Sequence, residues 1–204
     1  MARFMAVNLV GLLLLAVAWR HGLVAEIWQA DSSRLTLAIA AGFIWALAAG
    51  GWRAWKLSGE LDRLAAGRRS DKEGDYAAAI GRGVAPGVAA EALRAKLTER
   101  IGFLRYASGA LVSLGLVGTV IGFIIALSGV DPSRVGDASA IGPMVAKLIE
   151  GMGVALYTTL VGATLGVWTA LNHRILATGA ANLYAAILES VPCSTSRPEP
   201  SFAM

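Results

Sequence analysis

Four long apolar runs divide the chain into membrane-sized segments, at residues 4–19, 35–52, 106–128 and 151–171. A helix needs roughly 20 apolar residues to cross about 30 Å of hydrocarbon. None of the runs alternates polar and apolar positions, as the strands of a membrane barrel do. The pattern therefore predicts an all-α membrane protein with four transmembrane helices.

The first run leaves two interpretations open. Arg3 precedes it, and Ala16-Val17-Ala18 near its end forms the A-x-A pattern of a signal-peptide cleavage site. Cleavage would leave three transmembrane helices. Retention would give a first helix over residues 4–25, with Arg20 extending its charged end toward the membrane interface.

The remaining polar and apolar segments predict the rest of the organisation. The expected elements are a second transmembrane helix over 35–55, a basic helical loop over 56–104, a third transmembrane helix over 105–129, an outer loop over 130–142, a fourth transmembrane helix over 143–172, a further helix over 173–191 and a disordered tail over 192–204. Pro143 suits the first turn of the fourth helix.

Within the basic loop, residues 57–66 and 76–80 are candidate short helices. Leu93 and Leu97 lie one turn apart on a helical face that Ile101 and Leu104 continue. We expect this last helix of the loop to run unbroken into the third transmembrane helix.

Charge sets the expected orientation. Residues 53–105 contain eleven of the 18 Lys and Arg residues, which favours a cytoplasmic location for this loop and both termini. The net charge of +4 is explained by this topology, so we expect no nucleic-acid partner. The single cysteine, Cys193, excludes an internal disulfide and a thiolate metal cluster. No nucleophile with an adjacent base, phosphate-binding loop or metal-ligand cluster is recognisable, so we expect no enzyme activity, metal or cofactor.

Small residues form a stripe along each of the last two transmembrane helices. Their spacing places them on one helical face, where they allow another helix backbone to approach closely. The stripe of the third helix contains Ser108, Gly115, Gly118, Gly122 and Ala126, and that of the fourth contains Gly151, Ala155, Gly162 and Gly166. We predict that both stripes are helix-packing faces.

Three threonines and one ion pair are the polar candidates. Thr119 and Thr159 lie nine and eight residues inward from the outer ends of their runs, so both are predicted about 12 to 13 Å deep, with Thr158 adjacent. They suit an ion pathway, although membrane threonines commonly bond back to a carbonyl of their own helix. Lys147 and Glu150 are neighbours at the outer mouth, as a simple ion pair or as a site that recruits cations.

The strings GLVGTVIGFIIAL and LIEGMGVALYTTLVGATLGV, joined by a short loop, resemble the paired core helices of the MotA/TolQ/ExbB proton-channel family. The resemblance covers about residues 93–172. It implies a homo-oligomer, expected to be a pentamer, around a single-span partner whose membrane aspartate carries the ion. Thr119 and Thr159 match the family's pore threonines, and the small-residue stripes would face the partner helices and the neighbouring subunit.

The function implied by this resemblance is that of an inner-membrane subunit coupling a proton or sodium flow to mechanical work at the cell envelope. Neither the ion nor the driven machine is apparent from the sequence. The alternative from a different class is a non-conducting scaffold protein that uses its small-residue faces for packing alone. A small-molecule transporter is a third interpretation, disfavoured because broken helix pairs in inverted repeats are missing from the sequence.

Overall fold

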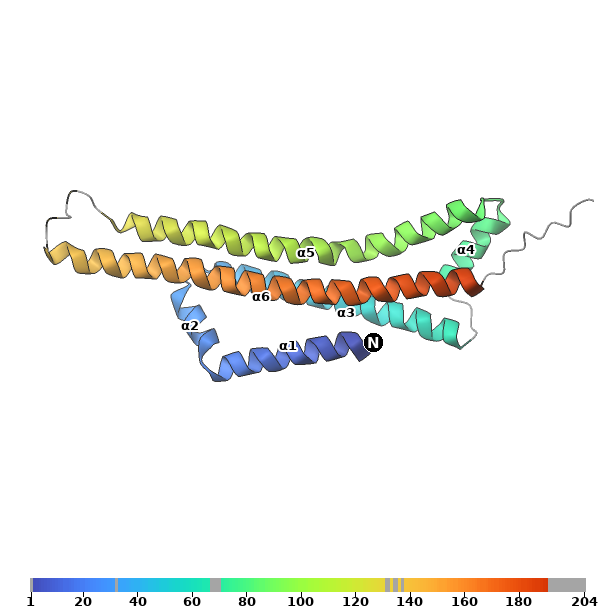
Figure 1. The fold of residues 1–204 in the computed structure, drawn as a ribbon, viewed down its shortest axis with the longest axis horizontal. Coiled ribbons are helices and arrows are strands. Elements are labelled where there is room, and N and C mark those ends of the chain that lie inside the picture. The colour runs from blue at the N-terminus through green and yellow to red at the C-terminus, as the bar shows by residue number, and fades with distance from the viewer. Residues whose placement is uncertain are drawn as a thin grey trace, which may run out of the picture. The chain divides into compact units, whose positions relative to one another are not determined.

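A computed structural model describes residues 2–31, 33–66, 71–130, 133, 136 and 138–190. The described residues form six helices and no strands. The helices, labelled in Figure 1, are α1 (Ala2–Arg20), α2 (Leu23–Ala30), α3 (Leu35–Ala65), α4 (Asp71–Gly81), α5 (Pro86–Ser128) and α6 (Ala138–Ser190). Four of them, α1, α3, α5 and α6, are long and apolar enough to cross a membrane. The predicted all-α class with four transmembrane helices is confirmed.

Contacts divide the chain into two units. One comprises residues 1–54 and 101–176, and the other comprises residues 55–100 and 177–204. The first unit contains α1, α2 and the apolar parts of α3, α5 and α6. Its core includes Ile39, Phe43 and Leu111, which are buried together between α3 and α5, with Trp168 of α6 packed against them.

The second unit contains the polar ends of the same long helices together with α4. Tyr76 of α4, Leu93 and Leu97 of α5, and Leu183 and Ile187 of α6 are buried there. The Leu93 and Leu97 face is the one that the sequence pattern predicted. The expected continuity of this helix with the third transmembrane helix is confirmed, because α5 is one helix of 43 residues.

Three boundaries differ from the sequence prediction. The first helix ends at Arg20 and not at residue 25, because Gly22 adopts a positive φ of 77° that breaks the helix before α2. α3 joins the second transmembrane helix to the helix predicted over 57–66 and ends at Ala65, and α6 joins the fourth to the helix predicted over 173–191 and ends at Ser190. Neither joined segment contains a proline, and single glycines cost a helix only about 1 kcal/mol each.

The predicted outer loop over 130–142 is too long. α6 begins at Ala138, so Pro143 lies inside the helix and not in its first turn. A proline at this place removes one backbone hydrogen bond near the end of a helix of 53 residues, which the rest of the helix tolerates. The predicted tail over 192–204 lies outside the described residues.

Asp31 organises the connection between α2 and α3. Its Oδ1 atom accepts hydrogen bonds from the Ser33 backbone N–H at 3.1 Å and the Ser33 hydroxyl at 2.6 Å. Its Oδ2 atom accepts the Thr36 backbone N–H at 2.7 Å, which satisfies a donor in the first turn of α3. Burial alone raises the pKa of Asp31, but the hydrogen bonds from Ser33 and Thr36 outweigh it and leave the pKa below its usual value.

Candidate functional site

The small-residue stripes of α5 and α6 lie against each other. A methyl group added at Gly162 would lie 2.8 Å from the Gly115 Cα atom and 2.8 Å from the Leu111 carbonyl oxygen. One added at Gly122 would lie 2.5 Å from both the Ala155 nitrogen and the Gly151 carbonyl oxygen. Carbon atoms in contact are normally about 3.5 to 4.0 Å apart. The two antiparallel backbones therefore approach so closely that side chains at these positions have no room.

The same contact continues along the rest of the seam. Gly118 faces the side chain of Thr158, Gly151 faces the backbone of Ala126, and Gly166 faces Val112 and the Ser108 carbonyl. The sequence reasoning assigned the stripes to partner helices and neighbouring subunits, and the structure places them against each other within one chain. The reason is that helical periodicity identifies which face is bare but not which helix covers it.

Hydroxyl groups of both helices reinforce this seam. Ser108 Oγ donates a hydrogen bond across it to the Gly166 carbonyl at 2.8 Å, and Thr159 Oγ1 donates to the Gly115 carbonyl at 3.1 Å. Thr158 is fully buried and donates to the Val154 carbonyl of its own helix at 2.7 Å. Of this threonine pair, Thr159 thus holds the two helices together, whereas the Thr158 hydroxyl is enclosed within the seam.

Thr119 has a different environment from the other two threonines. It is only partly buried, and its hydroxyl donates to the Leu116 carbonyl at 2.6 Å within its own helix. A hydroxyl that donates one bond keeps acceptor lone pairs. Because Thr159 bonds to Gly115, one turn from Thr119 along α5, the two predicted pathway threonines lie at nearby levels of the hairpin but do not bond to each other.

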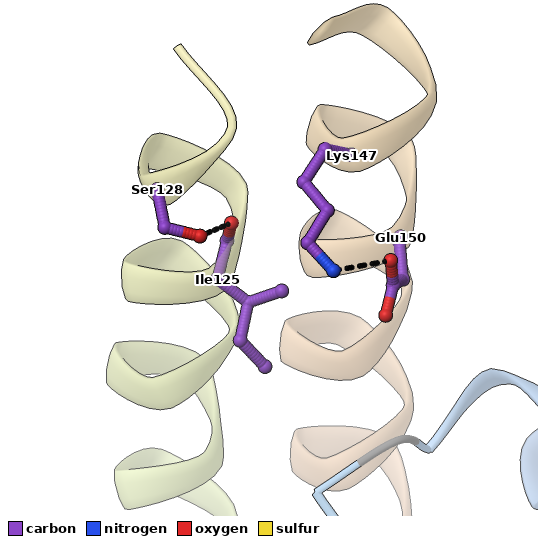
Figure 2. A network of polar contacts seen from close by, with 4 residues as sticks. All are labelled: Ile125, Ser128, Lys147 and Glu150. Atoms are coloured by element: carbon purple, nitrogen blue, oxygen red, sulfur yellow. Dashed lines mark hydrogen bonds and ion pairs between the residues drawn. The ribbon is translucent and has the colours of Figure 1, made fainter. Parts of the chain in front are cut away.

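Lys147 and Glu150 form the predicted ion pair at the end of the seam next to the α5–α6 connection, with Nζ to Oε2 at 2.9 Å (Figure 2). Both side chains are about two-fifths exposed. The lysine stem packs over Gly129 at the end of α5, and Ser128 closes that end by donating to the Ile125 carbonyl at 2.7 Å. The pair therefore lies where α5 and α6 end their contact.

A polar cluster that the sequence reasoning missed joins α1 to α6. Asn8 Nδ2 donates to Asn172 Oδ1 at 2.9 Å, and the Trp168 Nε1 and Asn172 Nδ2 atoms donate to Asn8 Oδ1 at 3.1 and 3.2 Å. Asn172 is 1% exposed, and Gly11 of α1 packs directly on the Trp168 ring. The available signal was Asn8 itself, since a side-chain amide inside an apolar run is costly unless it finds a partner.

Acidic side chains are missing from the seam. The sequence contains no Asp or Glu between residues 101 and 128 or between 151 and 171. Among the described residues, no three His, Cys, Asp or Glu side chains gather closely enough to hold a metal ion. An ion moving along this hairpin would find hydroxyl and carbonyl oxygens but no titratable acid of this chain.

The comparison with protein families identifies the hairpin. The model of the MotA/TolQ/ExbB proton channel family matches residues 84–188, which is more than half of the chain and includes all of α5 and nearly all of α6. Neither the curated proteins nor the solved structures gave a significant match.

Proposed function

Because this chain belongs to the MotA/TolQ/ExbB proton channel family, we propose that it is the pore-forming subunit of an ion-driven energy transducer in the bacterial inner membrane. The observation that carries the proposal is the position of the family match, which coincides with the close-packed α5–α6 hairpin. In this role the subunit couples a flow of protons or sodium ions to mechanical work at the cell envelope.

The proposed channel needs a partner that supplies an acid. The hairpin offers oxygen atoms but no carboxylate along residues 101–128 and 151–171, and a membrane ion path normally contains an ionisable group. A homo-oligomer, expected to be a pentamer, would surround a single-span partner with one membrane aspartate. The α5–α6 seam is already filled within each chain, so the partner contacts other faces of the hairpin.

Within this proposal the threonines have separate roles. Thr119 is the strongest candidate for the pathway, because it is partly exposed and its oxygen can still accept a hydrogen bond or coordinate an ion. Thr159 contributes by fixing α6 to the Gly115 carbonyl of α5, one helical turn from Thr119. Thr158 is assigned to packing, since its hydroxyl is buried and bonded to Val154. Lys147 and Glu150 remain the proposed mouth of the pathway.

The proposed topology places the basic segment between α3 and α5 and the C-terminal end of α6 in the cytoplasm, following the Lys and Arg distribution. It retains α1 in the mature protein. The hydrogen bonds among Asn8, Trp168 and Asn172 support retention, because removal of α1 would leave the buried Asn172 and the Trp168 N–H without these partners.

The test is ion flux in proteoliposomes that contain the purified chain and the single-span protein with which it copurifies. Thr119→Val should abolish the proton or sodium flux that a potassium diffusion potential drives, while leaving the oligomer intact on native gels. Thr164→Val is the matched control, since Thr164 is exposed on α6 and lines the groove beside α1. Equal flux in all three proteins would contradict the pathway assignment.

The scaffold alternative is supported by one observation, that the hydroxyls of Ser108, Thr158 and Thr159 all bond within the hairpin. It predicts no flux in the wild-type complex at any membrane potential, together with assembly defects when seam glycines are enlarged. Potential-dependent flux that Thr119→Val abolishes would exclude it.

A further inference from the structure

A recess of about 600 Å³ lies at the junction of α2 and α3, away from the α5–α6 seam. Its apolar wall consists of Val24, Ile27 and Trp28 from α2 with Leu37 and Ala40 from α3. Asp31, Arg34 and Thr36 supply its polar end. The recess therefore combines an apolar surface with one acidic and one basic residue at the place where a membrane helix begins.

The apolar residues of α2 have no protein neighbours that bury them. All eight residues of α2 are described and none is buried, and Trp28 is 66% exposed. Leu23, Val24, Ile27 and Trp28 repeat at helical spacing, whereas Glu26 and Gln29 are polar. This pattern is typical of helices that lie in the membrane interface with their apolar face against acyl chains.

The contacts of α2 place this junction beside α6, past the Lys147 end of the seam. Ala30 at the end of α2 lies 3.9 Å from the position of a methyl group on Gly153. Lys147 precedes Gly153 by six residues, or about 9 Å along the helix. The polar residues of the junction thus lie beside a stretch of α6 whose neighbours Met152 and Leu156 are exposed and apolar. Here a polar junction lies at the level of an apolar stretch of α6. A bilayer adapts to a short apolar span by local thinning, which would bring lipid headgroups to the level of the junction.

Arg34 and Asp31 can each still bind a group of the opposite charge. Arg34 forms no side-chain ion pair with any residue that the structure describes, and its φ of 55° holds it in the left-handed region. Asp31 uses Oδ1 twice and Oδ2 once, so an acceptor position remains on Oδ2.

We propose that this recess binds a zwitterionic phospholipid whose headgroup carries a primary ammonium group. Arg34 would hold the phosphate, Asp31 would accept the ammonium, and an acyl chain would cover Val24, Ile27 and Trp28. The recess balances one positive and one negative side chain, which matches a zwitterion better than an anionic lipid. Its apolar wall favours a lipid over a free phosphate ion.

The test uses quenching of Trp28 fluorescence by lipids with brominated acyl chains. Wild type and Trp28→Phe are reconstituted as full chains in phosphatidylcholine vesicles that contain one brominated lipid, and the difference between them isolates Trp28. Brominated phosphatidylethanolamine should quench Trp28 at least twofold more than brominated phosphatidylglycerol or phosphatidylcholine at equal mole fraction. Arg34→Ala should remove this preference, and Arg34→Lys should retain part of it.

Arg20→Ala is the control, because Arg20 is exposed at the end of α1 and does not line the recess. It should leave the preference unchanged. Quenching that is independent of the headgroup, or stronger with phosphatidylglycerol, would overturn the proposal. Loss of the preference on adding inorganic phosphate would also overturn it, because it would identify a site for a soluble anion.

Discussion

Enlarging a seam glycine by one methyl group tests how much of the fold depends on close approach of α5 and α6. In Gly122→Ala, the new carbon would lie 2.5 Å from the Ala155 nitrogen and 2.7 Å from the Ala155 Cβ atom. Normal contact distances are about 3.5 to 4.0 Å, so the helices must separate locally by about 1 Å. The obstructing atoms include backbone, which cannot rotate away as a flexible side chain can.

Overpacking of this kind costs about 1 to 3 kcal/mol. Alanine regains part of that cost, because it forms helix more readily than glycine by about 0.5 to 1 kcal/mol. We therefore expect a net loss of about 1 to 2 kcal/mol, or a 5- to 30-fold change in the unfolding equilibrium. The measurement is unfolding of the purified chain with increasing sodium dodecyl sulfate in mixed micelles, followed by tryptophan fluorescence.

Gly109→Ala provides the matched control on the same helix. A methyl group at Gly109 would meet no atom within 4 Å, so this variant should be as stable as wild type or slightly more stable. If Gly122→Ala and Gly109→Ala unfold at the same detergent fraction, the close approach at Gly122 does not stabilise the hairpin and the reasoning fails.

Three further predictions concern polar contacts outside the glycine seam. Asn8→Leu should lower stability by about 1 to 2 kcal/mol in the same detergent assay, because it leaves Asn172 without an amide partner; an unchanged midpoint would contradict the role of this cluster. Since the folded-state pKa of Asp31 is lowered, its stabilisation should be complete at neutral pH and be lost as the pH falls below about 4 through that lowered value. Thermal unfolding of Asp31→Asn between pH 3 and 7 should lack this component, and an acid limb identical to that of wild type would refute it. Lys147→Met should change stability by less than about 1 kcal/mol, because its ion pair with Glu150 is exposed; a loss above 2 kcal/mol would show that the pair matters more.

The sequence was sufficient for features that depend on periodicity along one helix. The apolar runs predicted four spans, and the spacing of Leu93 and Leu97 predicted a helix continuous with the third span. The end of α1 was placed too late, because nothing in residues 20–25 distinguishes a glycine inside a helix from Gly22 with positive φ. The helix over 57–66 was predicted as a separate element, whereas α3 joins it to the second span in one helix that ends at Ala65.

Contacts between helices were less accessible to sequence reasoning. A bare face such as Gly115 and Gly118 could accept a helix of the same chain, another copy or a partner, and periodicity alone does not select among them. The chain itself resolves this choice, since α6 presents a second bare face of the same length across a short connection. The sequence also shows that Asn8 needs a hydrogen-bond partner, because it lies in an apolar run. It does not show that the partner is Asn172, 164 positions later.

The register between helices follows from the contacts that sequence reasoning missed. Asn8 meets Asn172 and Gly11 meets Trp168, so α1 is antiparallel to α6, and nine residues further along α1 Arg20 reaches about the level of Thr159. The polar end of α1 and the Asp31 junction therefore lie beside residues of α6 that follow Lys147 by about six to twelve positions. If the chain spans the bilayer in this register, the ends of α5 and α6 next to their connection extend beyond α1 with exposed apolar side chains such as Phe123. The hairpin thus needs lipid or protein around this end that α1, α2 and α3 of the same chain do not supply, which is the physical reason to expect further subunits around it.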